Sequence, residues 1–276
     1  MIGRSRGARP IVCLLAVLAA LSTVSCGAAL TKLPMGPGAP APDAGDAFAE
    51  ATKTCRAISS MTADASVSGS AGGRRLRARL SLGVQSPASA RLEAIGPFAH
   101  PLFTLAARGD TATLLLNEDN RILEGGRPGA VLEAITGVPL EAGDLREALT
   151  GCSSATALSA GQQFGDEWRM LRDGSRSIYL NRHPQSAPWR LAAVVHQDGS
   201  TPEWRTEYAN FVDGLPRTIR FVSSNRDRFN LRLELRDIEL NPALGPDAFQ
   251  VKIPASATPI TLEELRRAGP LRDESR

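Results

Sequence analysis

Long stretches of the chain alternate between apolar and polar residues, which is typical of strands with one face on a core and the other in water. The clearest stretch is residues 75–84, in which Leu76, Leu80 and Leu82 share one face and arginines share the other. Residues 229–240 repeat the same pattern. We therefore expect antiparallel strands that pack one face against a core.

The same period of two predicts further strands through most of the chain. Besides the two above, the predicted strands are 62–70, four short segments between 91 and 126, 167–172, 175–181, 189–196, 203–211 and 216–223, with a closing edge at 247–254. From these segments we expect a sheet of about ten or eleven strands. Because strand twist accumulates, one sheet of that length must curl.

Apolar residues at helical spacing predict a helix before the first strand, with Asp43 or Asp46 as its cap. Its apolar stripe consists of Phe48, Ala51, Cys55, Ile58 and Met61. Two short amphipathic helices are expected at 129–136 and 144–149, and one helical turn at 261–267. The helices can lie in the concave face of the curled sheet, where they would cover either a cavity or a packed core.

The first residues have the pattern of a bacterial export signal. Three arginines precede an apolar segment at 11–24, which is too short for a convincing membrane span. The segment leads to Cys26 in a context that resembles a lipobox, although Thr23 stands where an aliphatic residue is usual. We expect a lipoprotein signal peptide at 1–25 and a diacylglycerol on Cys26. The alternatives are an ordinary secretory signal and an uncleaved anchor.

The residue after Cys26 bears on which membrane the lipoprotein would be sorted to. Gly27 is not the aspartate that retains enterobacterial lipoproteins in the inner membrane. The resemblance therefore implies a lipid anchor in the outer membrane, with the protein facing the periplasm.

Composition divides the rest of the chain. Residues 26–45 are rich in proline, glycine and alanine, and are expected to form a disordered tether. One folded domain is expected at 46–257, followed by a charged C-terminal tail at 258–276. The three signal arginines carry the whole formal net charge of +3, so the mature chain is neutral. Its arginines are spread along strand faces, which argues against nucleic acid as a partner.

The loop between two predicted strands at 96–101 carries an unusual tip. Gly96 and Pro97 break the first strand, Pro101 begins the return, and Phe98 lies between them. Loop tips are normally polar. Phe98 therefore either folds back to plug one end of the sheet or contacts an apolar surface outside the protein.

Residues 91–155 resemble the LolA/LolB family of lipoprotein carriers and receptors, and LolB in particular. The matching motifs are Arg91-Leu92, Pro97-Phe98, Gly125, Thr136-Gly137-Val138-Pro139-Leu140, and Leu145-Arg146 to Leu149-Thr150-Gly151. Phe98 stands where the family typically has leucine, and residues 165–187 form a longer region than the corresponding one in the family.

This resemblance implies an unclosed antiparallel half-barrel wrapped round a helical lid, with an apolar cavity beneath the helices. It implies a membrane-anchored receptor that accepts the acyl chains of lipoproteins and delivers them to the outer membrane. The partners would be the acyl chains, a periplasmic LolA-like carrier, and the membrane through lipidated Cys26. A monomer is expected.

The predicted lipid-cavity residues are the apolar members of the strands. They are Leu76, Leu80, Leu82, Leu92, Phe103, Leu105, Leu114, Leu116, Phe221, Leu231, Leu233 and Leu235. Pro97 and Phe98 form the predicted membrane-contact loop. A one-residue change of register would turn a whole set outward, so each strand's set must face the core together.

Two cysteines remain in the mature domain. Cys13 is removed with the signal and Cys26 is acylated, which leaves Cys55 and Cys152. Exported proteins can keep disulfides, so these two residues can pair. The alternative is two buried free thiols.

Catalytic motifs are missing from the sequence. There is no Gly-x-Ser-x-Gly, His-Glu-x-x-His, P-loop or Gly-x-Gly-x-x-Gly segment. His100, His183 and His196 are isolated from one another. We therefore expect no enzyme, no metal site and no cofactor. Two other functions remain open, a scaffold or sensor in the envelope and a carrier of another lipid; a filled interior would favour the scaffold and an empty apolar one the carrier.

Overall fold

The structure is a computed structural model that describes residues 30–96, 100–155, 158–199, 201–225 and 227–268. In chain order the strands are β1 (Ala39–Ala41), β2 (Ser60–Ala71), β3 (Arg74–Gln85), β4 (Ser89–Ile95), β5 (Pro101–Arg108), β6 (Thr111–Leu116), β7 (Arg121–Gly126), β8 (Gly161–Phe164), β9 (Trp168–Asp173), β10 (Arg176–Asn181), β11 (Arg190–Asp198), β12 (Thr201–Val212), β13 (Leu215–Ser223), β14 (Phe229–Leu240) and β15 (Thr258–Pro259).

Across the described ranges these fifteen strands form one sheet that is not closed into a barrel. Its order is β1-β8-β9-β10-β11-β12-β13-β14-β2-β3-β4-β5-β6-β7-β15, so β1 and β15 are its two edges. Neighbouring strands are antiparallel except β15, which is parallel to β7. The predicted fold class, mainly β with an unclosed sheet round helices, is confirmed, although the sheet has more strands than expected.

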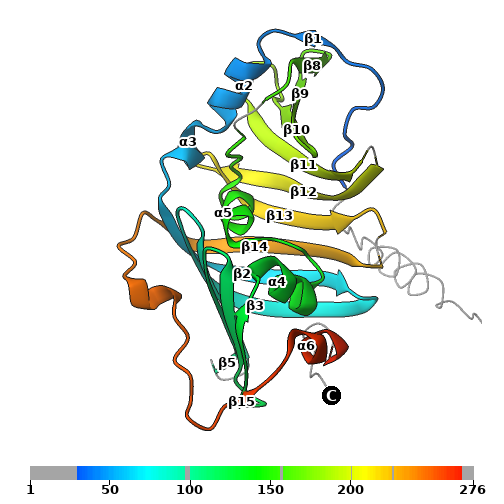
Figure 1. The fold of residues 1–276 in the computed structure, drawn as a ribbon. Coiled ribbons are helices and arrows are strands. Elements are labelled where there is room, and N and C mark those ends of the chain that lie inside the picture. The colour runs from blue at the N-terminus through cyan, green and yellow to red at the C-terminus, as the bar shows by residue number, and fades with distance from the viewer. Residues whose placement is uncertain (1–29, 97–99, 156–157, 200, 226, 269–276) are drawn as a thin grey trace, which may run out of the picture. The chain divides into compact units, whose positions relative to one another are not determined.

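Five α-helices are present in the part of the chain that the structure describes. They are α2 (Ala44–Ala51), α3 (Lys53–Arg56), α4 (Pro128–Thr136), α5 (Ala142–Thr150) and α6 (Leu262–Ala268). Helix α2 contacts β8 to β11, α5 contacts β3, β4 and β13, and α4 contacts β6 and α6 (Figure 1). Buried residues of α2, α4, α5 and α6 belong to one core cluster with the strands, so the helices cover the inner face of the sheet.

The centre of the sheet is the pairing of β2 with β3 and β14. β2 and β3 are in register from Ser60 opposite Gln85 to Ala71 opposite Arg74. The backbones of β2 and β14 approach closely at Gly69, whose φ is +142° and where a Cβ would lie 2.0 Å from the carbonyl oxygen of Asn230. A glycine is required at this point because no side chain fits.

The predicted first helix is too long. Helices α2 and α3 end at Arg56, Ile58 lies in the connection, and Met61 is already in β2. Met61 fits helical spacing from Ile58, but it also starts an alternation with the buried Ala63. β2 pairs with β14 on one side and with β3 on the other, and this pairing favours the strand over the helix at Met61.

Ordered structure also extends past both predicted domain boundaries. Ala39–Ala41 pairs with β8, so part of the expected tether at 26–45 is strand β1. In the expected C-terminal tail at 258–276, β15 pairs with β7, and α6 buries Leu265. The expected closing edge at 247–254 is not a strand, since it contains the end of a 3₁₀-helix at Pro246–Phe249 with Phe249 in the core.

Three predicted features lie outside the described residues: the signal peptide at 1–25, the lipidation site Cys26, and the loop residues Pro97 and Phe98. Among the helices that the structure describes, none is long and apolar enough to cross a membrane.

Candidate lipid-binding site

The predicted lipid-cavity residues all lie on the core side of the sheet. Ten are buried, namely Leu76, Leu82, Leu92, Phe103, Leu105, Leu114, Phe221, Leu231, Leu233 and Leu235. Leu80 and Leu116 are partly buried and pack against the same core. Arg236, which follows the buried Leu235 in β14, is exposed, as expected if the leucines face the core and the intervening residues face solvent.

Five of these residues meet helix α4 around a small apolar cavity of about 40 Å³. The lining residues are Val67, Leu76, Ala78, Leu80, Leu92, Phe103, Leu132, Ile135, Thr136 and Leu231. The hydroxyl of Thr136 donates to the carbonyl oxygen of Leu132 at 2.7 Å, so it presents no free polar group to the cavity. A buried water needs about 10–15 Å³, so the space holds a few waters at most and no acyl chain.

The other predicted lipid-cavity residues lie in packed core rather than around this cavity. Leu82, Leu105, Leu114, Leu116, Phe221, Leu233 and Leu235 are absent from its lining. The inner face is therefore a mostly filled core with one small apolar gap beneath α4.

Helix α4 is specified by its ends and by one apolar face. Pro128 is at its first position, where the missing N–H costs nothing. Gly137 ends it in the left-handed conformation with φ +79°. Val131, Leu132 and Ile135 are buried and turn the same face to the sheet.

Polar contacts add little to the packing of α4. The carboxylate of Glu141 accepts a hydrogen bond from the backbone N–H of Gly129 at 3.0 Å. The ion pairs Arg127–Glu141 at 3.1 Å and Arg228–Glu133 at 3.8 Å join exposed side chains. Exposed pairs contribute about 0–1 kcal/mol each, so apolar burial is the main force holding α4 down.

Comparison with known proteins gives a fold and no closer relationship. No family model and no curated protein matches the chain. The solved structure of the LolA superfamily protein NE2245 from Nitrosomonas europaea matches with a TM-score of 0.54 and 12% identity, covering 77% of this chain and 98% of that one. This chain has a LolA-like fold. A DUF1329 family protein from Desulfovibrio piger matches with a TM-score of 0.52 and 9% identity, covering 76% of this chain and 97% of that one.

A disulfide links two helical segments of this LolA-like fold. Cys55 of α3 and Cys152, which follows α5, are bonded, with their Cα atoms 5.5 Å apart. The bond joins the first helices to the segment that leaves α5. The structure therefore contains the pairing that the two remaining cysteines allowed.

A half-buried polar cluster beneath α5 is a part of the structure that the sequence did not reveal. His196 stacks on Trp204, with ring centroids 3.6 Å apart and an interplanar angle of 8°. Burial, and to a smaller extent the charge of Arg176, lowers the pKa of His196 to about 4. The ring is therefore neutral at pH 7. His196 belongs to no recognisable sequence motif. Its stacking on Trp204 follows from the pairing of β11 with β12, which places the two residues opposite each other.

The charged groups near His196 pair with one another. Arg176 is paired with Glu147 at 3.3 Å and with Asp173 at 2.5 Å. Burial raises the pKa of the carboxyl of Asp144 and of the Tyr208 hydroxyl. His100 is exposed, and the exposed His183 contacts Glu167 at 2.6 Å. Within the described residues, no group of three or more potential metal ligands comes together.

Proposed function

We propose that this protein is a membrane-anchored carrier that holds the acyl chains of lipoproteins under α4 and delivers them to the outer membrane. The observation that carries the proposal is the apolar cavity between α4 and the inner face of the sheet. The LolA-like fold supports it, because one face of its open sheet is apolar and is covered only by short helices. A LolB-like role, with a periplasmic LolA-like carrier as donor, is the specific form of the proposal.

Loading requires α4 to move, since the cavity of about 40 Å³ is too small for an acyl chain. Displacement would expose Val131, Leu132 and Ile135, each of which is worth roughly 1.5–3 kcal/mol when buried. Each acyl CH₂ that replaces them contributes about 0.8 kcal/mol. About six to eleven buried methylenes therefore offset the displacement of the three side chains. A fatty acyl chain of ordinary length meets this condition.

The exchange is close to balanced, and that is useful for a carrier. A site that bound acyl chains much more tightly than a bilayer does would never release them. No covalent step and no cofactor is needed. We propose that the protein is not an enzyme.

Delivery would use the lipid anchor and the loop at 96–101, whose central residues lie outside the described part of the chain. We propose that lipidated Cys26 keeps the domain at the outer membrane and that Pro97 and Phe98 contact the lipid surface. Phe98→Glu should leave acyl binding intact and impair transfer of a labelled lipoprotein to liposomes. Transfer at the wild-type rate would reject this role for Phe98, and a large loss of thermal stability would show that Phe98 is a core residue.

The experiment that tests the carrier function is mass spectrometry of molecules that co-purify with the protein from native membranes. Acylated peptides or whole lipoproteins, in near-stoichiometric amount, are the expected result. Free phospholipid or glycolipid in their place would indicate a carrier of another lipid. A preparation without any acylated ligand would contradict the carrier function.

A second candidate function is a scaffold or sensor in the cell envelope, and the mostly filled interior favours it. Such a protein would use its surface and never open α4. The two functions differ in one measurable property. Locking α4 in place would abolish a carrier and leave a scaffold unaffected.

A further inference from the structure

A cavity beside the disulfide is separate from the apolar gap under α4 and differs from it in having two arginines and several serines in its lining. It has a volume of about 410 Å³, which is within the range of small-ligand sites. It is lined by Arg56, Ala57, Ile58, Ser59, Ser86, Arg146, Cys152, Ser153, Ser154 and Ala155. The two cavities share no residue.

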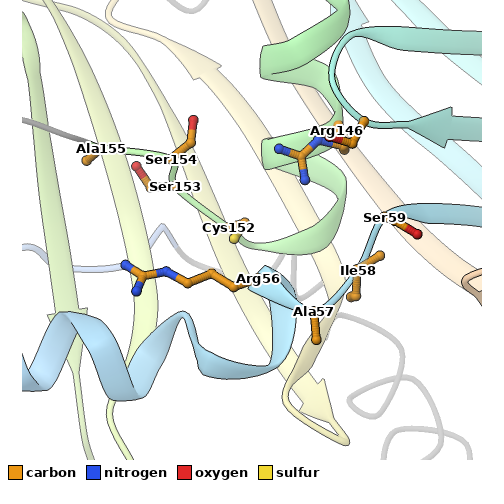
Figure 2. Close-up of a pocket in the computed structure, with 10 residues that line it drawn as sticks. Arg56, Ala57, Ile58, Ser59, Arg146, Cys152, Ser153, Ser154 and Ala155 are labelled. Atoms are coloured by element: carbon orange, nitrogen blue, oxygen red, sulfur yellow. The ribbon is translucent and has the colours of Figure 1, made fainter.

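Two arginines reach this polar cavity from different helices. Arg56 ends α3, and Arg146 lies in the middle of α5 (Figure 2). The lining, all of it within the described residues, contains no aspartate or glutamate. Glu147, the acid next to Arg146 in sequence, pairs instead with Arg176 and accepts the hydroxyl hydrogen bond of Ser154. The positive charge of the cavity is therefore not compensated by its own lining.

Two lining groups are buried without a hydrogen-bond partner. The hydroxyl oxygen of Ser153, a residue only 2% exposed, has none, and neither does Nε of Arg146. Native proteins rarely leave buried polar groups unpaired, and a bound ion or water is one explanation for those that occur. Figure 2 shows Ser153 on the segment that follows Cys152, on the same cavity as both arginines. A donor set of two guanidinium groups and a hydroxyl suits a tetrahedral oxyanion, because guanidinium binds phosphate oxygens in pairs.

We propose that this cavity binds a phosphate-type oxyanion, held by Arg56, Arg146 and Ser153. The volume exceeds that of the bare anion, and Ile58 and Ala155 supply an apolar wall beside the charged groups. The cavity therefore has room for an organic group attached to the phosphate. The same donor chemistry serves inorganic phosphate and a phospholipid headgroup, so the experiment must separate these two sources.

The disulfide holds the two halves of this site together. Arg56 is adjacent to Cys55, and Ser153 is adjacent to Cys152, in a bond that spans 97 residues of sequence. Without the bond, nothing covalent fixes the end of α3 against the segment that leaves α5. The disulfide therefore keeps the chain segments that carry Arg56 and Ser153 close together.

The test is isothermal titration calorimetry with the full chain, purified in a nonionic detergent at low salt. Sodium phosphate is one ligand and glycerophosphoglycerol, the deacylated headgroup of phosphatidylglycerol, is the other. Arg146→Gln should weaken binding by about tenfold, since it removes a charged donor. Arg75→Gln is the matched control. Arg75 carries the same charge as Arg146, but it is exposed at the start of β3, whereas the cavity residue Ser86 follows the end of that strand. Ser153→Ala is a second variant that adds no charge change and should weaken binding several-fold.

Binding by wild type and by Arg75→Gln, with a loss in Arg146→Gln and Ser153→Ala, supports the site. Tighter binding of the headgroup would assign a lipid source, and equal or tighter binding of inorganic phosphate would assign the free anion. No binding of either ligand to the oxidised wild type overturns the proposal. Wild-type affinity in Ser153→Ala and Arg146→Gln also overturns it. The proposal does not rest on the carrier function, because acyl-chain binding is measured at the other cavity.

Discussion

The carboxylate of Glu141 accepts a hydrogen bond from the backbone N–H of Gly129, with 3.0 Å between Oε2 and the nitrogen. This contact joins the residue before α5 to the first turn of α4, where helix N–H groups have no partner within the helix. A Cβ at residue 129 would lie 2.6 Å from Oε1 of Glu141, so glycine permits the close approach. One side chain therefore fixes how the two helices over the core begin.

Glu141→Ala should loosen α4 without unfolding the domain. The lost hydrogen bond lowers the free energy of unfolding by about 1 kcal/mol. It should also speed the uptake of a fluorescent fatty acid, measured by stopped-flow mixing, if loading requires α4 to move. Arg127→Ala is the control, since it removes only the exposed ion pair to Glu141 and should change neither quantity. Equal uptake rates in wild type and Glu141→Ala would contradict the proposed movement of α4.

Helix α6 provides a second restraint on α4. It contacts α4 directly, and its Leu265 is 2% exposed. Leu265→Ala should lower stability by about 2–5 kcal/mol, measured by urea denaturation, and should also increase fatty-acid uptake. Arg266→Ala, at an exposed position of the same helix, should do neither. A loss of stability with unchanged uptake would show that α6 supports the fold without controlling α4.

Much of this architecture could be predicted, because alternation reports which face of a strand meets a core. Leu231, Leu233 and Leu235 of β14 are buried as predicted. The short strand β8, next to the edge strand β1, could not be predicted, since it has the sequence Gly-Gln-Gln-Phe with every residue half-buried and no alternation. Its strand conformation comes from pairing with β1 and β9. Such pairing is a tertiary effect that local pattern does not contain.

The two cavities could likewise be predicted only in part. The apolar residues around the cavity follow from strand period, but the gap itself depends on how Leu132 and Ile135 of α4 meet the sheet. The arginine pair of the polar cavity was not predicted, because Arg56 and Arg146 are far apart in sequence. The disulfide between Cys55 and Cys152 was the one available signal, since it brings together the chain segments next to both arginines.

Reduction of the disulfide should weaken the fold. The bond closes a loop with a sequence separation of 97 residues. Removing a native disulfide typically costs about 2–5 kcal/mol. Thermal melting with and without a thiol reductant measures the difference, with the Cys55→Ser/Cys152→Ser double variant as the control that should no longer respond to reductant. Identical melting temperatures for oxidised and reduced wild type would contradict the expected stabilisation.

His196 should make stability depend on pH. Its pKa is about 4 in the folded protein against an ordinary value of 6.5, so the unfolded chain binds more protons between these pH values. The free energy of unfolding should therefore be highest above pH 6.5 and fall by up to about 3 kcal/mol as the pH drops toward 4. His196→Phe keeps an aromatic ring on Trp204 and should flatten this part of the profile. A variant profile parallel to that of wild type would show that other groups titrate here.

The most direct test of the carrier function is binding of a triacylated lipopeptide to the compact unit that begins at Leu33, followed by native mass spectrometry. Two variants sharpen it: Ala78→Leu fills the cavity, whereas Arg77→Leu places the same side chain on the exposed side of β3. The account predicts one lipopeptide per chain for wild type and Arg77→Leu, much weaker binding for Ala78→Leu, and none of the unacylated peptide. No complex with the folded wild-type protein, or equal binding of the acylated and unacylated peptides, would contradict it.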